Sequence, residues 1–257
     1  MTGIDVSLGE VAASLALIAV ALAVSRWRRA ELEQDIAVAV VRSMIQLFAI
    51  GYVIQAIFDE ESLLLTAVLI VVMVVFGAYT ARGRAAKVPG ALVPLLIALA
   101  LAAAGTLGLV LALGIFEATP RYLVPVGGMV IGNAMTAAAV ALNRLGDDVE
   151  ASARQIEATL ALGASSAEAA APIVRKSVRS GMIALVDSTK TTGLIFFPGT
   201  MVGMLLAGAD PTDAVRLQLI LLWVLLGSVA ISSLTATGLA YRGFFTPAHQ
   251  LREPPSP

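Results

Sequence analysis

Cysteine is absent from this 257-residue sequence, and histidine occurs once, as His249 in a polar stretch near the C-terminus. Without cysteine the chain forms no disulfide and offers no thiolate ligand to a metal. The long apolar stretches of the chain contain no histidine. They therefore hold no Ser–His catalytic pair, no histidine zinc triad and no histidine ligand for haem, which excludes an intramembrane Ser–His hydrolase.

Charged residues are also scarce. They make up 14% of the chain, whereas hydrophobic residues make up 58%. A soluble domain averages about 25% charged and about 45–50% apolar residues, so both deviations favour lipid as the solvent of this chain. The net charge of −1 provides no overall field that would attract nucleic acid. We therefore expect membrane lipid, and not nucleic acid, around this protein.

A phosphate-binding loop is missing as well. ATP-hydrolysing subunits of the P-loop class carry the pattern Gly-x-x-x-x-Gly-Lys-Ser/Thr. The lysines of this chain are Lys87, Lys176 and Lys190, and none of them follows a glycine. The chain is therefore not expected to be an enzyme, and any ATP-driven activity needs a second polypeptide as its motor.

Seven long apolar stretches fill most of the chain, each close to the ~20 residues that cross about 30 Å of hydrocarbon as a helix. Lipid offers no partner to backbone N–H and C=O groups, so each stretch is expected to be helical. Thr119-Pro120 and Asp210-Pro211 support two boundaries, because each places a capping residue before a proline at the first helical position. The predicted fold is an all-α polytopic membrane helix bundle with spans at 8–25, 36–57, 63–80, 90–114, 122–143, 181–207 and 213–240.

The distribution of lysine and arginine between the loops predicts the orientation. One set of loops carries acidic residues and only Arg121 and Arg216, and it is assigned to the outside. The N-terminus then lies outside and the C-terminus in the cytoplasm, which requires an odd number of spans and agrees with seven. We expect a multi-pass protein of the cell (cytoplasmic or inner) membrane, with one transmembrane domain over 1–245, a long cytoplasmic loop at 144–180 and a short cytoplasmic tail at 246–257. The basic residues of the cytoplasmic set are Arg26, Arg28, Arg29, Arg82, Arg84, Lys87, Arg144, Arg154, Arg175, Lys176, Arg179, Arg242 and Arg252.

The long loop favours two short helices that lie on the membrane surface. Asp147 and Asp148 are expected to open the first helix, and Gly163 to end it as a left-handed cap. Residues 165–168 have the pattern of a capping box for the second helix, which Pro172 should kink or interrupt. Two interpretations stay open: a surface hairpin without a partner, or a coupling element that docks on a cytoplasmic subunit.

Three charged side chains lie inside the predicted spans, where a charge is costly and usually marks function. Asp187 and Lys190 are three residues apart, so they share a helix face and are expected to pair. Arg42 lies at a similar depth in the second span and is placed to reach Asp187. Both a static ion pair that fixes helix register and a charge cluster beside a substrate path fit this pattern. Gln46 and Asn133 are expected to form interhelical hydrogen bonds.

Pro198-Gly199 interrupts the sixth stretch and is expected to break its helix, with 201–208 as a short outer segment. Broken helices are tolerated at membrane depth where they line a cavity, so a translocation path is predicted beside this break. Several methionines occur in the fifth and sixth stretches, where they either pack against neighbours or offer thioethers to a soft metal ion. They are Met129, Met135, Met201 and Met204.

The heptapeptide at 157–163, Glu-Ala-Thr-Leu-Ala-Leu-Gly, resembles the "EAA" loop of ABC-type permeases. Further segments, in the same order along nearly the whole chain, resemble the FetB/YbbM-type permease family, the membrane subunits of ABC transporters linked to metal export. Arg175-Lys176 departs from the loop pattern, which usually has Leu-Pro there, and Thr200 stands where the family usually has methionine. The matching segments are 42–47, 125–135, 160–164, 187–194, 198–203 and 207–211.

The resemblance implies a permease subunit that exports its substrate and is powered by a separate cytoplasmic ATPase. Glu157, Ala158, Leu160 and Gly163 would form its contact with that ATPase. A homodimer of the permease would offer two coupling loops to two ATPase subunits. This chain would bind no cofactor, and ATP would be used by the partner. Bacterial members are linked to iron and plant relatives to aluminium tolerance, so iron or another metal is the implied substrate.

A second functional class also fits the residues. A proton-coupled secondary transporter would use Asp187 and Lys190 as a proton relay and would need no ATPase. No internal repeat supports the inverted-repeat layout that many secondary transporters have. Association with a P-loop ATPase distinguishes the two classes.

Overall fold

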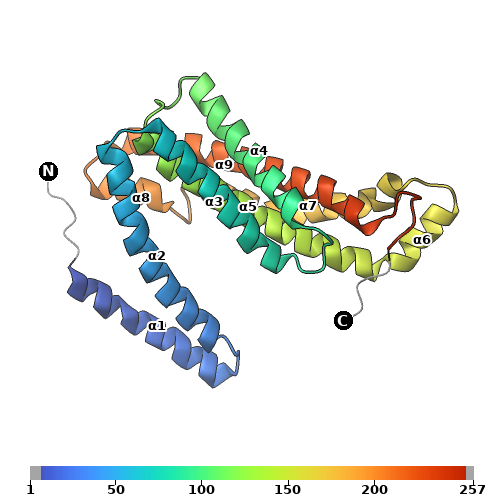
Figure 1. Cartoon of the computed structure of the whole chain (residues 1–257). Coiled ribbons are helices and arrows are strands. Elements are labelled where there is room, and N and C mark those ends of the chain that lie inside the picture. Colours follow the sequence, from blue (N-terminus) through green and yellow to red (C-terminus); the bar gives the residue numbers. More distant parts are fainter. Residues whose placement is uncertain (1–6, 253–257) are drawn as a thin grey trace.

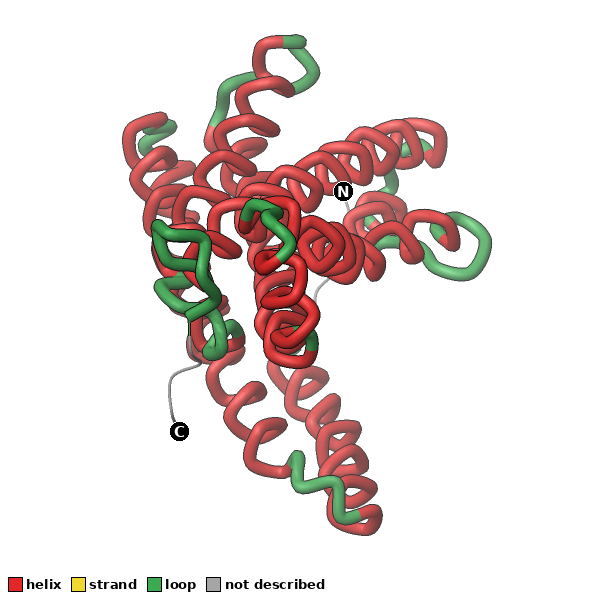
Figure 2. Tube along the Cα trace, turned by 90° about the vertical axis from the view of Figure 1, so that its right-hand side faces the viewer, coloured by secondary structure: helices red, strands yellow, loops and turns green. Residues whose placement is uncertain are grey.

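The computed structural model describes residues 7–252, which fold into helices joined by short loops, with no strand among them (Figures 1 and 2). Long helices lie side by side in an elongated bundle, a helical hairpin projects from it, and short helices lie at its ends (Figure 1). The α-helices are α1 Leu8–Arg28, α2 Glu33–Asp59, α3 Leu63–Arg84, α4 Leu92–Ala112, α5 Pro120–Ala151, α6 Ala153–Ala161, α7 Ser166–Thr191, α8 Gly199–Leu206 and α9 Pro211–Ala240; a 3-10 helix, Tyr241–Phe244, follows.

Six of these helices are long and apolar enough to cross a membrane: α1, α2, α3, α4, α5 and α9. The chain is thus an integral membrane protein built only from helices within the described residues. The predicted sixth span corresponds to the second half of α7 and to α8, and α7 does not meet the same criterion. Its 26 residues include Arg175, Lys176, Arg179, Asp187 and Lys190, which lower its hydropathy. Seven spans and the outward N-terminus therefore stay predictions.

Helix α5 is the centre of the bundle and packs against α3, α4, α7 and α9. Its inner face consists largely of small residues, among them the fully buried Ala134, Ala138 and Ala141. In lipid there is no hydrophobic force between helices, so association depends on close van der Waals packing, which small side chains permit. The alanine-rich sequence of α5 therefore explains why four helices gather around it.

The core also buries hydroxyl groups along α9. Ser228 and Thr237 are completely covered, and each hydroxyl donates a hydrogen bond to a carbonyl of its own helix, Ser228 to Leu225 at 2.8 Å and Thr237 to Ser233 at 2.7 Å. A buried hydroxyl without such a partner would be costly. These side chains are thus small enough for close packing, and their hydroxyl groups are hydrogen-bonded within their own helix.

The hairpin of α1 and α2 stands apart from the bundle (Figures 1 and 2). Only the last part of α2 is anchored, where Ile57 packs with Leu69 of α3 and Val124 of α5. None of the 18 residues of the most apolar stretch of α2 is buried. The remainder of this helix therefore faces whatever surrounds the bundle.

The predicted cytoplasmic loop is more helical than its sequence indicated. Helix α5 continues through 144–151, so Asp147 and Asp148 lie inside it and do not open a new helix; that prediction was wrong. The second loop helix was expected to lie on the membrane surface as a separate element, but it is the first part of α7, which runs unbroken through Pro172. Pro172 is exposed, so water can hydrate the carbonyl that its missing N–H leaves free.

The predicted helix ends and helix break are confirmed. Gly163 has a φ of +92° directly after α6, and Ser165 and Glu168 form the capping box of α7. Thr119 and Asp210 are the N-caps of α5 and α9. The break before α8 is longer than expected, because α7 already ends at Thr191 and residues 192–198 are not helical.

The closest helix crossing of the bundle lies at Gly181 of α7. A Cβ atom there would lie 2.6 Å from the carbonyl oxygen of Ala137, 2.9 Å from the Cβ of Ala141 and 2.9 Å from the hydroxyl of Ser233. Two of these three neighbours are backbone or Cβ atoms and cannot rotate away. Glycine is thus required where α7 crosses α5 and α9.

We predict that Gly181→Ala destabilises the bundle by about 1–3 kcal/mol, the usual cost of overpacking a core. The measurement is the apparent melting temperature of the detergent-purified protein. Gly238→Ala in α9 is the matched control, because a Cβ there meets no atom within 4 Å. Equal melting temperatures for the two variants would contradict the crossing described here.

Candidate functional site

The turn between α6 and α7 forms one tip of the molecule, at the end of the bundle where the described chain also finishes (Figure 1). Ile156 of α6 is buried, and Leu160 packs partly buried against the main core. Glu157, Ala158 and Gly163 are exposed. The short helix α6 thus has one face fixed to the bundle and one face open to the surroundings, as a docking helix requires.

The outer face of this turn carries an unusual apolar side chain. Leu162 is 90% exposed, directly before Gly163, whose N–H donates to the carbonyl of Leu160 at 2.9 Å. The left-handed conformation of Gly163 turns the chain sharply and leaves Leu162 at the tip. Three of the four predicted contact residues, Glu157, Ala158 and Gly163, share this surface, whereas Leu160 faces inward and supports it.

A capping box fixes the start of α7 beside this tip. The carboxylate of Glu168 accepts the backbone N–H of Ser165 at 2.8 Å and its hydroxyl at 2.7 Å. These hydrogen bonds lower the pKa of Glu168 below its ordinary value, the backbone bond contributing most. The stabilisation is therefore complete above the ordinary pKa of 4.5 and is lost as the pH falls through the lowered value. The turn is capped throughout the physiological range.

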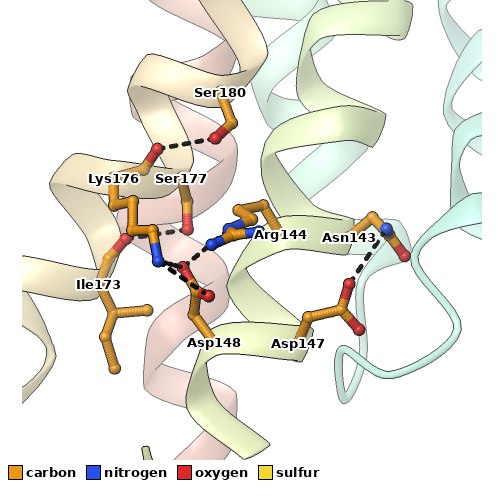
Figure 3. Close-up of polar contacts among 8 residues, drawn as sticks. All are labelled: Asn143, Arg144, Asp147, Asp148, Ile173, Lys176, Ser177 and Ser180. Atoms are coloured by element: carbon orange, nitrogen blue, oxygen red, sulfur yellow. Dashed lines mark hydrogen bonds and ion pairs between the residues drawn. The ribbon is translucent and has the colours of Figure 1, made fainter. Parts of the chain in front are cut away.

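A buried carboxylate joins α5 to α7 behind the turn (Figure 3). Asp148 of α5 accepts Nε of Arg144 at 2.9 Å and Nζ of Lys176 of α7 at 3.3 Å. The side chain of Asp148 is 12% exposed, whereas those of Arg144 and Lys176 are 40% and 58% exposed. Two cations thus converge on one mostly buried anion, which holds the first half of α7 at a fixed place on α5.

A second ion cluster secures the loop between α3 and α4. Lys87 donates to Asp147 and to Glu150, both at 2.9 Å, and these bonds raise the pKa of Lys87 above its ordinary value, the bond to Glu150 contributing most. A Cβ atom on Gly146 would lie 2.8 Å from the Cβ of Lys87. Glycine at this position therefore lets the loop pass close to α5.

The segment after α9 folds back onto the same end of the molecule. Nδ1 of His249 lies 2.9 Å from the hydroxyl of Ser166 and accepts its backbone N–H at 3.3 Å. Leu251 packs against the core. The segment at 246–252, expected to be a cytoplasmic tail, thus touches the first residue of α7; residues 253–257 lie outside the described part of the chain.

Of the predicted intramembrane charge cluster, the structure brings two members together. Asp187 and Lys190 pair at 3.0 Å on α7, with side chains that are 59% and 67% exposed. Arg42 joins no ion pair among the described residues, and its guanidinium lies 5.8 Å from the ring centroid of Phe76. The predicted contact of Arg42 with Asp187 within one chain is therefore wrong. The part of α2 that carries Arg42 stands away from the bundle and does not come next to α7.

The other predicted polar residues make few contacts. Asn133 donates to the carbonyl of Met129 in its own helix at 2.9 Å, so the interhelical bond expected for it is not formed. Gln46 is exposed on α2 and forms no side-chain hydrogen bond within residues 7–252. Pro198 is the N-cap of α8 and Gly199 its first residue. The break predicted at these two residues is therefore the start of α8.

Two of the four methionines lie against the packed core. Met135 packs beside the main cluster and Met129 beside a second one, and the hydroxyl of Thr200 lies 3.9 Å from the sulfur of Met129. Met201 and Met204 are half-buried in α8. Across residues 7–252, histidine, cysteine and acidic side chains form no cluster of three or more with metal-binding geometry.

Comparison with known proteins agrees with this membrane architecture. The model of the uncharacterised protein family UPF0014 matches residues 8–245. This chain belongs to the UPF0014 family. It is 36% identical over 242 residues, 94% of this chain and 93% of the relative, to the "Probable iron export permease protein FetB" of Escherichia coli (strain K12). The resemblance to the FetB-type family is thereby confirmed.

Plant members of the family are equally similar. The identity is 37% over 241 residues to the UPF0014 membrane protein STAR2 of Oryza sativa subsp. japonica, covering 94% of this chain and 85% of that protein. It is 36% over 241 residues to Protein ALUMINUM SENSITIVE 3 of Arabidopsis thaliana, covering 94% and 88%. No solved structure matches this chain.

Sequence reasoning missed the ion cluster at Asp148. The sequence pattern assigned Arg144 and Lys176 only to the basic residues of the predicted cytoplasmic loops, and it assigned Asp148 to the start of a helix. The spacing of Arg144 and Asp148 by four residues is the one signal in the sequence that indicates their pairing. The contact with Lys176, 28 residues further along the chain, depends on how α7 packs and has no local signal.

We predict that Asp148→Asn lowers the stability of the protein by about 1–2 kcal/mol, because it leaves two cations without their anion. The partial exposure of Arg144 and Lys176 keeps the cost at the low end for an ion pair. Asp213→Asn is the matched control: its pair with Arg216 is 3.5 Å long and exposed on both sides. Thermal unfolding should separate the two variants; a larger effect at Asp213 would refute this role of Asp148.

Proposed function

We propose that this chain is the membrane-spanning permease subunit of an ABC-type exporter, driven by a separate cytoplasmic ATPase that docks on the turn between α6 and α7. The single observation that carries the proposal is this turn. It presents Glu157, Ala158 and Gly163 beside the almost fully exposed Leu162, and it is fixed to the bundle on its other side. An exposed apolar side chain on a helix that is fixed from behind fits the docking of a helix into a hydrophobic groove of a partner.

The structure also offers a route by which docking energy reaches the membrane. Helix α7 begins at the turn and continues for 26 residues to the break at 192–198, a length of about 39 Å at 1.5 Å per residue. The ion cluster at Asp148 and the close crossing at Gly181 hold α7 against α5. A displacement of the turn would therefore be passed along a stiff helix to the break and to α8.

The proposed cargo is iron or another metal ion, exported from the cytoplasm. The supporting fact is the similarity to a relative whose name describes probable iron export; one other relative is named for aluminium sensitivity. Asp187 is the one carboxylate inside the second half of α7. Oxygen ligands suit hard cations such as Fe³⁺ and Al³⁺ better than thioethers do, so Asp187 is a better transient contact for this cargo than the four methionines.

The proposed complex contains two permeases and two ATPase subunits in the cytoplasmic membrane. No nucleotide is expected on the permease itself, since its lysines lack the phosphate-binding context. ATP binding and hydrolysis would occur on the partner. The permease would contribute the path, the docking surface and the mechanical link between them.

A proton-coupled secondary transporter is the second candidate, and one observation favours it. The pair of Asp187 and Lys190 is exposed on α7 at membrane depth, as a proton relay requires. In that case the protein would act without an ATPase, and Asp187→Asn would abolish proton-dependent transport while substitutions at the turn left it unchanged.

The test of the proposed function is co-purification. We predict that a P-loop ATPase from the native host accompanies the tagged protein in mild detergent, and that Leu162→Ser together with Gly163→Val removes it. The matched control is Leu113→Ser, since Leu113 is also an exposed leucine at a helix end, 64% exposed after α4. Glu157→Lys, compared with the exposed Glu117→Lys, tests the charge of the docking face.

Loss of the ATPase with the turn variants but not with the controls is the expected result. If the wild type purifies alone although the ATPase is verified as expressed, or if the controls lose it equally, the proposal is wrong. After the expected co-purification result, cellular metal content is measured in strains with and without the permease. Accumulation of metal in the strain that carries the Leu162 variant would agree with export.

A further inference from the structure

The outer half of α2 is anchored on the bundle by one stripe of residues. Ile50, Ile54 and Ile57 recur at spacings of three and four and pack with Leu69 of α3 and Val124 of α5. Toward the cytoplasm the same stripe continues with Gln46 and then Ser43. The helix face that packs at its outer end therefore becomes polar where it has left the bundle.

This polar part of α2 has no protein neighbour that satisfies it. Gln46 and Ser43 are exposed, and the hydroxyl of Ser43 bonds only to the carbonyl of Val40 in its own helix. Arg42, on the flank of the stripe, joins no ion pair within residues 7–252, and its guanidinium lies 5.8 Å from the ring centroid of Phe76. Lipid chains cannot pair with a guanidinium or an amide, so lipid does not fit as the neighbour.

The bundle has an open face at the same depth. Gly132 and Thr136 of α5 have no helix over them, and a Cβ atom on Gly132 would meet no atom within 4 Å. Asp187 of α7, which pairs with Lys190 at 3.0 Å, is 59% exposed. Lys176 meets Asp148 and Gly181 meets Ala137, so α7 runs antiparallel to α5 and Asp187 lies about 9 Å beyond Gly181, near the level of Gly132.

Arg42 lies at a matching depth. It is 15 residues before Ile57, or about 22 Å along α2, and Thr136 is 12 residues after Val124, or about 18 Å along α5, while Ile57 and Val124 are in contact. Because α2 is tilted away, its depth at Arg42 is less than its path length, which brings the two positions level. Arg42, which has no carboxylate partner in the described part of the chain, thus lies at about the same depth as the exposed carboxylate of Asp187, whose partner within the chain is Lys190 of its own helix.

We propose that a second copy of this chain covers both surfaces: the polar stripe of α2 from one copy lies on the open face of α5 and α7 of the other, with Arg42 beside Asp187 across the interface, twice by two-fold symmetry. Helix α2 is one continuous helix whose outer part is already packed. Closing it onto its own bundle would require it to bend or to lose that packing. Glycine at 132 permits the close approach of a partner helix.

The inference names the interface of the dimer that the proposed function includes, but it does not depend on an ATPase or on transport. Its test uses charge exchange between two differently tagged copies. One copy carries Arg42→Asp and the other Asp187→Arg. In a mixed dimer both interface pairs again unite opposite charges, whereas each homotypic dimer contains two like-charge pairs, which are strongly disfavoured.

We expect one tag to pull down the other about tenfold more efficiently for the mixed pair than for either variant with itself. This ratio corresponds to about 1.4 kcal/mol. If the two surfaces instead meet within one chain, mixing has no effect and only the double variant in a single copy recovers its stability. That outcome overturns the proposal, as does equal pull-down for all combinations.

Cross-linking keeps the inference testable if charge variants fail to fold, and the natural chain supplies a cysteine-free background. One copy carries Gln46→Cys and a differently tagged copy Thr136→Cys, and native membranes are treated with a mild oxidant. A disulfide-linked pair of the two tags is expected. Leu101→Cys on the exposed face of α4 replaces Thr136→Cys as control. No link with Thr136→Cys, or an equal link with Leu101→Cys, rejects the interface.

Discussion

The crossing of α5, α7 and α9 at Gly181 is the constraint on which the rest of the structure depends. Backbone of α5 and the hydroxyl of Ser233 come so close to α7 that no side chain fits between them. This contact sets the height and the direction of α7, a helix too polar to be held by lipid alone. The turn between α6 and α7 before it and the break after it both take their positions from this crossing.

Polar interactions are concentrated at the N-terminal end of the same helix. Asp148 and the capping box at Ser165 fix the start of α7 from two sides, and the returning C-terminal segment adds a contact through His249. The opposite end of α7 has no comparable support, since residues 192–198 make mainly turn contacts. Helix α7 is thus held firmly at its start and at its crossing, and less firmly at its end.

Local signals in the sequence were sufficient for most helix ends. Gly163, the Ser165–Glu168 pair, Pro211 and Pro198 each act within a few residues, so their effect can be read without the fold. Hydropathy located six helices correctly for the same reason. The continuation of α5 past Asn143 and of α7 through Pro172 could not be read locally, because contacts between α5 and α7 stabilise helix where the isolated sequence is polar.

In the candidate site, too, some features follow from the local sequence and others depend on the tertiary arrangement. Exposure of Glu157 and Gly163 follows from the amphipathic pattern of α6, and the pair of Asp187 and Lys190 follows from their spacing. The inward position of Leu160, the ion cluster at Asp148 and the separation of Arg42 from α7 are properties of the tertiary arrangement. Charged side chains at similar depth on distant helices can pair in many combinations, so depth alone was not sufficient to predict which of them meet.

The exposed Leu162 has a consequence for how the proposed complex would be assembled in the cell. A leucine that stands exposed at the tip of the molecule is compatible with water only at a cost, and burying it fully is worth about 1.5–3 kcal/mol. In the proposed complex the bound ATPase would cover this side chain, whereas a surplus permease would expose it. Chaperones and proteases that bind exposed apolar residues would therefore distinguish orphan subunits from assembled ones, and the amounts of the two polypeptides would be matched after synthesis.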